Sequence, residues 1–379
     1  MGNGHWRWGI LGAGAAARGM AAALQAVNGR IEAIASRREK TAQELAAEYG
    51  IQRVHATPNA LVSDPDLDVI YIASPHDSHH HWMKAAVEAG KHVLCEKAIT
   101  LNSRQLAEVC ALARQKNVLV LEAMTIHHMP LYRKLRTLID SGALGRVRLV
   151  QVNFGSWRVF DPESRFFSRD LAGGALLDIG VYATAFARWF LDAAPTQVLT
   201  TVELAPTGVD EQSGIILKND RGQLVVMALS LTAKQPKRGV VSCEKGYIEI
   251  GEYPRADSAL IHWTDDGRTE TVTAGRREEA LQYEVRDMQH YLDGWQAGGL
   301  GQAGGLGQAG EPEQRGTASV AAAGEGLLPP SMRAAGLTAA VPGAAPACDD
   351  AAALLAQSQE VMAVLTEVRR QWGVMYPGE

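Results

Sequence analysis

Cysteine is scarce in this chain of 379 residues, and its few cysteines are not placed to work together. Four are present, with no CxxC pair and no close spacing: Cys95, Cys110, Cys243 and Cys348. A tight disulfide framework is therefore excluded. The pattern is typical of a reducing compartment, and we expect a cytoplasmic protein.

The chain also lacks an excess of positive charge and any long apolar run. It has 37 Lys and Arg residues against 42 Asp and Glu residues, a net charge of −5. This balance argues against a nucleic-acid surface or a polybasic membrane patch. No apolar run reaches the roughly 18 residues that a membrane span needs. The first predicted strand, 6–11, leaves no room for a signal peptide. We expect neither a nucleic acid nor a membrane as a partner.

The chain does have the length and the apolar content, 46%, for about two domains. Alternating strands and helices predict an α/β fold that begins with a Rossmann nucleotide-binding domain over residues 1–125. Alternating apolar residues without crossover helices then predict a second α/β domain, 126–295, with an open, mostly antiparallel sheet.

Residues 296–348 break this pattern, because GGLGQA at 298–303 is repeated at 304–309. Gly, Ala, Pro and Gln dominate, so we expect a flexible, low-complexity insert that is dispensable for folding. A helical pattern resumes over 349–379, and we expect its helix, 350–379, to pack back near the first domain.

A glycine-rich turn follows the first strand. It reads GAGAAA from Gly12 to Ala17, the GxGxxA form of a dinucleotide-binding turn. Gly12 permits the tight turn, and Gly14 lets the backbone approach a pyrophosphate. The helix that begins near Ala15 offers its N-terminal amides to the phosphates. The turn therefore predicts a bound dinucleotide.

The end of the second predicted strand, 31–35, indicates which dinucleotide binds. An NAD site places an acidic residue there, about 20 residues beyond the glycines, to bind the ribose hydroxyls. This chain has Ser36, Arg37 and Arg38 instead. Guanidinium groups suit a phosphate, so we expect NADP, with NAD as the alternative cofactor. The arginines could also merely flank the start of a helix.

A glutamate and a lysine leave a buried strand together within Lys91–Ala98. Apolar residues run into Cys95, Glu96 and Lys97. Because the carboxyl ends of parallel strands face the ligand crevice, we expect Glu96 and Lys97 to meet the cofactor and the substrate. The alternative is a solvated strand end without a role.

Four histidines follow the predicted strand 68–73 and precede a helix predicted over 82–89: His76, His79, His80 and His81. No cluster of Cys, Asp or Glu completes a metal site, and histidines within one helical turn point in different directions. We therefore expect no metal. Ser74 and His79 are instead expected to lie near the nicotinamide.

Asp178 and Tyr182 lie four residues apart in a predicted apolar helix, 173–191, so they share one face. A carboxylate in such a helix needs a reason. The preceding loop, 156–167, carries arginines and aromatic residues. We expect Arg158, Arg165 and Asp178 to contact the substrate; the alternative is a packed loop with solvated arginines.

Three motifs stand at a recognisable spacing: GILGAG at Gly9–Gly14, KHVLCEK at Lys91–Lys97 and GGALLDIGVY at Gly173–Tyr182. With them, the chain resembles the Gfo/Idh/MocA oxidoreductase family, in particular its dihydrodiol dehydrogenase and glucose–fructose oxidoreductase-like branch, over roughly 5–295 and the last helix. The resemblance implies the two domains above and oligomer contacts through the second sheet. We expect a homodimer or a higher homo-oligomer.

The resemblance also implies catalytic roles for Lys97, Asp178 and Tyr182. Two positions depart from the family pattern: Ala98 replaces a proline, and His76 replaces an asparagine. The repeat insert has no counterpart in the family.

We therefore expect an NADP-dependent oxidoreductase that moves hydride between the nicotinamide and a secondary alcohol or carbonyl of a sugar, polyol or cyclic diol. Tyr182 would carry the proton if the cationic Lys97 lowers its pKa. Lys97 itself is the alternative carrier. Two other functions stay open: an NAD-assisted glycosidase or isomerase that retains its cofactor, and a nucleotide-binding sensor without catalysis.

Overall fold

A six-stranded parallel sheet forms the first domain of the computed structural model, which describes residues 6–298 and 347–379. The strand order is β3-β2-β1-β4-β5-β6, and all neighbouring pairs are parallel. The strands are β1 Arg7–Leu11, β2 Arg30–Ala35, β3 Arg53–Val54, β4 Val69–Ile72, β5 His92–Glu96 and β6 Val120–Ala123. The order reverses between β1 and β4, so the loops after these strands flank a crevice.

Helices cover both faces of this sheet. They are α1 Ala15–Ala26, α2 Glu39–Tyr49, α3 Pro58–Val62, α4 His76–Glu88 and α5 Ser103–Lys116. Tyr71 of β4 and Leu94 of β5 pack into one core with α1, whereas Ile70 and Val93 pack into another with α4 and α5. The central residues of these strands are apolar because both faces of the sheet are buried.

The second sheet has eight strands in the order β14-β13-β12-β11-β7-β10-β9-β8. They are β7 Val147–Gly155, β8 Gln197–Leu204, β9 Asp210–Lys218, β10 Leu224–Ser230, β11 Gln235–Cys243, β12 Gly246–Gly251, β13 Ser258–Trp263 and β14 Thr269–Thr273. All neighbouring pairs are antiparallel except β7 and β10. A π-helical turn, η1 Leu176–Gly180, and α8 Val181–Phe190 lie between β7 and β8 and pack on one face of the sheet.

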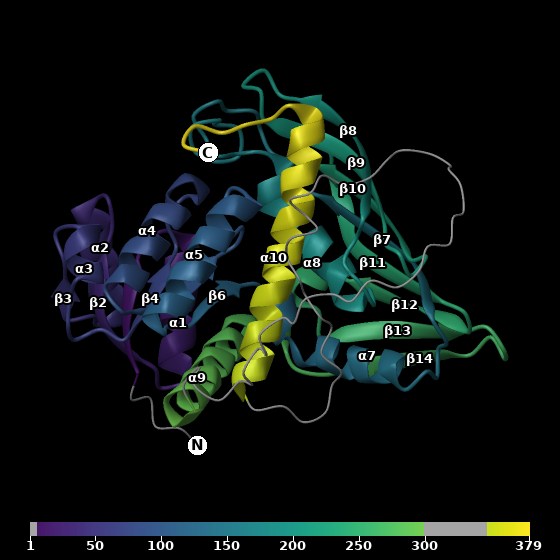
Figure 1. The fold of residues 1–379 in the computed structure, drawn as a ribbon, viewed down its shortest axis with the longest axis horizontal. Coiled ribbons are helices and arrows are strands. Elements are labelled where there is room, and N and C mark those ends of the chain that lie inside the picture. Colours follow the sequence, from purple (N-terminus) through teal and green to yellow (C-terminus); the bar gives the residue numbers. More distant parts are fainter. Residues whose placement is uncertain (1–5, 299–346) are drawn as a thin grey trace, which may run out of the picture.

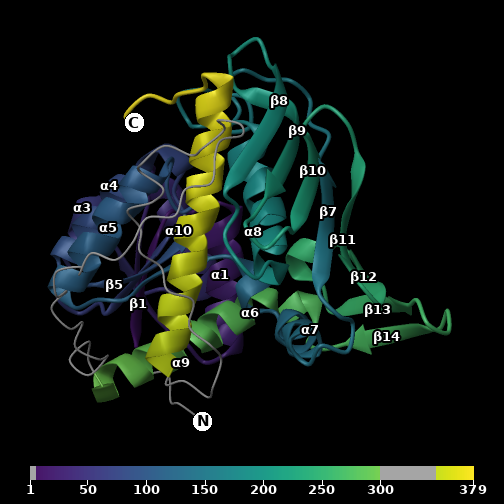
Figure 2. The ribbon, with the colours of Figure 1, turned by 45° about the vertical axis from the view of Figure 1, so that its right-hand side comes forward.

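Two long helices, α9 Ala280–Gly298 and α10 Ala347–Trp372, follow the second sheet in the chain. The remaining elements are short: α6 Thr125–His128, α7 Pro130–Asp140 and the 3₁₀ turns η2 Tyr253–Arg255 and η3 Arg277–Glu279. Figures 1 and 2 show α10, in yellow, running between the two sheets. It contacts α5 and β6 of the first domain and α8 and β8 of the second. Helix α10 therefore packs against both domains.

The fold class predicted from the sequence is confirmed, but several details differ. Helix α4 begins at His76 and not at Trp82, so the four histidines lie inside it. The elements β3, α3, α6, β8 and β14 were not predicted. The GGLGQA repeats lie outside the described residues except for their first glycine. Within the described part of the chain, no helix has the length and apolar character needed to cross a membrane.

Candidate active site

The carboxyl end of β5 meets the helical segment that follows β7. Lys97 Nζ donates to the backbone oxygen of Asp178 at 2.6 Å and to its Oδ1 at 3.2 Å. The same ammonium lies 4.8 Å from the centroid of the Tyr182 ring. Asp178 is carried by the π-helical turn η1, a type of turn that is frequent at functional sites. The structure thus brings together the three side chains that the sequence put forward as catalytic.

Asp178 is an anion held between two cations. Its side chain is buried, and its Oδ1 also accepts from Arg165 Nη1 at 3.2 Å. Burial by itself would raise the pKa of Asp178, but attraction by Lys97 and then by Arg165 outweighs it and lowers the pKa well below its usual range. The carboxylate therefore stays charged and holds Lys97 in place.

The pKa of Tyr182 is raised, and the expectation that Lys97 lowers it is wrong for this structure. Burial is the main cause, and the charge of Glu96 is the second. Lys97 lies over the face of the ring, which also packs against Phe154. The Tyr182 hydroxyl consequently keeps its proton at neutral pH and can act as a hydrogen-bond donor.

The glycine-rich turn has the geometry that a pyrophosphate needs. Gly12 has φ +121°, and a Cβ there would lie 2.5 Å from the oxygen of Ala73. A Cβ on Gly14 would meet nothing within 4 Å, so space is open beside the turn. No side chain caps the N-terminus of α1, which begins at Ala15. These residues fit the phosphates of a dinucleotide and would hold them by backbone amides.

Two exposed arginines follow the end of β2. Ser36 Oγ donates to the oxygen of Arg38 at 2.6 Å and lies 3.0 Å from Thr41 Oγ1, so the serine stabilises the local turn. Arg37 and Arg38 are exposed, and neither guanidinium makes a hydrogen bond or ion pair with a described residue. The charge of Arg37 acts on Asp77, whose pKa is raised by burial. Two exposed cations at this position suit a ribose phosphate.

His79 lies in the core beside the corner that follows Lys97, and its expected place near the nicotinamide stays a prediction. The side chain is fully buried, with Nδ1 2.9 Å from the oxygen of Ala98 and Nε2 2.8 Å from the oxygen of Ser74. It ties the end of β4 to the corner after Lys97. Ser74 itself is half-buried, and its Oγ accepts from Ser78 Oγ at 2.7 Å.

His76 connects the two domains. Its Nε2 lies 3.2 Å from the oxygen of Lys97, and its Nδ1 lies 3.3 Å from the oxygen of Ala172. Burial, followed by the charges of His79 and Lys97, lowers the pKa of His76 to about 3, so the ring is neutral near pH 7. At the same corner, the Lys97–Ala98 peptide bond is cis.

Buried carboxyl groups lie behind the Lys97 corner. Glu96 Oε1 accepts from the Tyr71 hydroxyl at 2.5 Å, and burial raises the pKa of Glu96. Glu122 accepts from the amide of Ile99 at 3.1 Å and from Ser358 Oγ at 2.7 Å. Burial raises the pKa of Glu122 to about 7.

The sequence analysis named Glu96 as a cofactor contact but missed Glu122 and a third buried acid, Glu284. Glu122 could have been found, because it lies one residue before the end of the buried parallel strand β6, as Glu96 lies at the end of β5. Glu284 gave no such signal, since it lies in the ordinary amphipathic helix α9. It is fully buried, and its two oxygens have no hydrogen-bond partner among the described residues. Burial raises the pKa of Glu284 far above its usual value.

Two arginines of the loop between β7 and η1 make cation–π contacts with a phenylalanine ring. The guanidinium carbons of Arg158 and Arg165 lie 4.4 and 4.1 Å from the centroid of Phe166. Only Arg165 also reaches Asp178. Trp157 and Phe160 of this loop are 58% and 45% exposed. Arg165 thus places a cationic group next to Asp178, and the same loop exposes two apolar side chains.

Comparisons with known proteins cover both domains. Residues 6–124 match the model of an oxidoreductase family with an NAD-binding Rossmann fold, and residues 132–249 match the GFO/IDH/MocA C-terminal domain. The chain is 32% identical to the trans-1,2-dihydrobenzene-1,2-diol dehydrogenase of Xenopus laevis over 259 residues, 67% of this chain and 78% of that protein.

Two further similarities extend this result. A D-xylose 1-dehydrogenase (NADP(+)) of Haloferax volcanii is 33% identical over 70% of this chain and 83% of its own length. The crystal structure of a 3-ketoreductase from Actinomadura kijaniata in complex with NADP and TDP-benzene is similar with a TM-score of 0.68 and 25% identity. That match covers 76% of this chain and 90% of the ketoreductase.

Proposed function

The chain belongs to the Gfo/Idh/MocA family of oxidoreductases, and from this membership we propose an NADP-dependent enzyme for the secondary alcohol or carbonyl group of a sugar, polyol or cyclic diol. Membership itself establishes an NAD(P)-binding oxidoreductase that acts on CH–OH groups. The observation that carries the proposal is the contact of Lys97 with Asp178 and Tyr182 at the end of β5.

The substrate class rests on the relatives and on the loop beside Asp178. The relatives are named for a cyclic diol and for a sugar. Arg165 offers N–H donors to hydroxyl groups, while Trp157 and Phe160 offer exposed apolar faces. A ring with vicinal hydroxyls matches both kinds of surface.

The choice of NADP rests on Arg37 and Arg38. Both are exposed and make no hydrogen bond or ion pair with a described residue, at the strand end where NAD sites carry an acid. A 2′-phosphate would accept hydrogen bonds from these two guanidinium groups.

We assign proton transfer to Lys97. An ammonium group has three N–H donors, and two of them are directed at Asp178, which leaves the third for the substrate oxygen. In reduction Lys97 gives this proton to the oxygen, and in oxidation its neutral amine accepts it. Tyr182 keeps its own proton and donates a hydrogen bond to the same oxygen. The bound nicotinamide supplies or accepts the hydride.

We also propose a homo-oligomer formed through the second sheet and, since Cys95, Cys110 and Cys243 are free thiols, a cytoplasmic location.

A panel of sugars, polyols and cyclic diols offered with NADP and with NAD tests the proposal. We expect reduced cofactor to accumulate with at least one diol or sugar, and faster with NADP. Substrate conversion without any net change of the cofactor would contradict it and favour a glycosidase or isomerase.

A further inference from the structure

The segment Val374–Glu379, which we call the strap, follows α10 and lies across both domains. Gly373, with φ +70°, turns the chain after Trp372. The amide of Val374 donates to the oxygen of Arg369 at 3.1 Å, so the strap folds back along the end of α10. Tyr376 is 3% exposed, which shows that the strap is packed and not a loose end.

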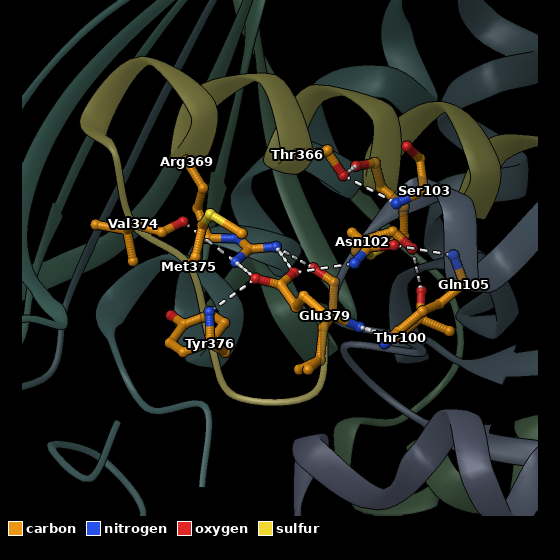
Figure 3. A network of polar contacts seen from close by, with 12 residues as sticks. Thr100, Asn102, Ser103, Gln105, Thr366, Arg369, Val374, Met375, Tyr376 and Glu379 are labelled. Atoms are coloured by element: carbon orange, nitrogen blue, oxygen red, sulfur yellow. Dashed lines mark hydrogen bonds and ion pairs between the residues drawn. The ribbon is translucent and has the colours of Figure 1, made fainter. Parts of the chain in front are cut away.

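An ion pair joins the strap to the end of α10, and hydrogen bonds join this pair to the first domain (Figure 3). The Arg369 guanidinium donates to both carboxylate oxygens of Glu379, at 2.5 and 2.8 Å. The same guanidinium donates to the oxygen of Leu101 at 2.5 Å. Asn102 Nδ2 donates to Glu379 at 3.0 Å. Both charged side chains are nearly buried, at 3% and 8% exposed. Leu101 and Asn102 follow Lys97 by only four and five residues.

A second set of bonds fastens the strap to the other domain. The Tyr376 hydroxyl donates to the oxygen of Gly173 at 2.6 Å, and the Tyr376 ring lies under the Arg369 guanidinium. Arg169 donates twice to the oxygen of Met375, at 3.1 and 3.0 Å. Gly173 begins the segment that carries Asp178.

The strap therefore binds both chain segments that form the contact between Lys97 and Asp178. One end fixes the residues that follow Lys97, and the other fixes the residues that precede Asp178. His76 ties the same two segments on the neighbouring carbonyl, that of Ala172. None of the strap residues touches Lys97, Asp178 or Tyr182 directly in the contacts that the structure describes.

We propose that Arg369, Tyr376 and Glu379 are positioning residues, which hold the corner after Lys97 and the turn before Asp178 at the separation that the reaction needs. This inference rests on the proposed function. Because a misplacement of about 1 Å can cost about 100-fold in rate, loosening either end should lower kcat. Cofactor binding should be spared, since the glycine turn and Arg37 lie elsewhere in the first domain.

Two variants of the full chain test this, each with a matched control. Tyr376→Phe removes the hydroxyl from Gly173 and keeps the ring, and Glu379→Gln removes the partner of Arg369. Glu367→Gln makes the same change to a buried glutamate of α10 that pairs with Arg370. Tyr283→Phe removes a hydroxyl of α9 that donates to Glu279 of η3. Hydrogen exchange of peptides covering 97–105 and 172–182, kcat, KM and NADP affinity are measured for all four.

We expect faster exchange in both peptides and a kcat reduced about 10-fold or more in the two strap variants, with NADP affinity within about twofold. The two controls should match the wild type. Exchange in the strap variants equal to that of the controls would overturn the proposal. Faster exchange with unchanged kcat would overturn the positioning role. If the wild type is active on no substrate, the proposed function is overturned, and with it the role of the strap in catalysis. The hydrogen-exchange rates would then still decide whether the strap holds the two segments.

Discussion

At the scale of single residues, the two cations around Asp178 differ in how firmly they are held. The Lys97 side chain is 13% exposed, whereas that of Arg165 is 56% exposed. Water screens an exposed ion pair, so Arg165 adds little to the charge balance. Lys97 is therefore the main partner of Asp178, and we expect the removal of Lys97 to lower turnover the most.

Replacing Lys97 by Met should lower turnover by about 10²–10⁴, because the proposed proton carrier is lost. Replacing Tyr182 by Phe should cost only about 10-fold, the value of one hydrogen bond, because the ring remains packed. Steady-state kinetics with the best substrate of the panel measures both. An equal and large loss in Tyr182→Phe would show that the tyrosine carries the proton.

Replacing Arg37 by Asp should weaken NADP binding by about 10- to 100-fold, since a hydrogen bond to a charged phosphate is lost and a repulsive charge is added. NAD binding should change little. Fluorescence titration of both cofactors measures the ratio. Lys40→Asp, an equal change of charge on an exposed residue nearby, is the control. NADP affinity that falls no further in Arg37→Asp than in this control would refute the role of Arg37.

The sequence could predict that Lys97, Asp178 and Tyr182 lie together, because each belongs to a short motif that fixes the direction of its side chain. It could not predict the burial of His79 or the raised pKa of Tyr182. Both depend on groups distant in the chain: the oxygen of Ala98 for His79, and burial within the second domain for the tyrosine.

At the scale of elements, periodicity located most helices and strands but not their ends. The histidines of α4 are not apolar, so the helix was expected to begin only at Trp82. The π-helical turn η1 was also missed, because one additional residue in a turn leaves no mark in an i, i+4 pattern. This turn places the backbone oxygen of Asp178 within reach of Lys97.

The ion pair between Glu379 of the strap and Arg369 of α10 should make the free energy of unfolding depend on pH. Burial raises the pKa of Glu379, but its hydrogen bonds with Arg369 and with the amide of Tyr376 outweigh this, and the net pKa is lowered. A lowered pKa contributes stability above the unfolded value, about 4.3, which is lost as pH falls through the folded value. Glu379→Gln should thus cost about 1.5–3 kcal/mol in the free energy of unfolding near pH 7.

That deficit should shrink toward zero as the pH falls below about 4, because the wild type then loses the same charge. Urea unfolding at a series of pH values measures it. Tyr376→Phe is the comparison, since no carboxylate is removed and its deficit should persist. A constant gap between the wild type and Glu379→Gln across the pH range would contradict this account.

At the scale of the whole molecule, the sequence was sufficient for the two-domain architecture, because a parallel and an antiparallel sheet leave different apolar patterns. It was not sufficient for the position of the strap. Contacts such as Tyr376 with Gly173 join residues about 200 apart, and no local pattern reports them.

The second sheet leaves one face without cover within the described chain. Leu199, Ile216 and Val226 lie side by side on β8, β9 and β10. Beyond Val226 the same row passes through the polar residues Gln151 and Glu249 before it reaches Leu260 on β13. Leu199, Ile216 and Val226 are 37–66% exposed. Three adjacent, exposed apolar side chains on a sheet are typical of an interface, so this is where we propose the contact between subunits.

Replacing Ile216 by Lys should dissociate the oligomer, because the charge would be buried between the apolar neighbours Leu199 and Val226 of the row. We expect the dissociation constant to rise at least about 10-fold, which corresponds to about 1.4 kcal/mol. Sedimentation velocity over a range of concentrations measures it. Gln43→Lys, on the exposed face of α2, adds the same charge away from the sheet and should leave assembly unchanged. A wild type that sediments as a monomer at all concentrations, or an Ile216→Lys variant that assembles like the wild type, would show that this face does not join subunits.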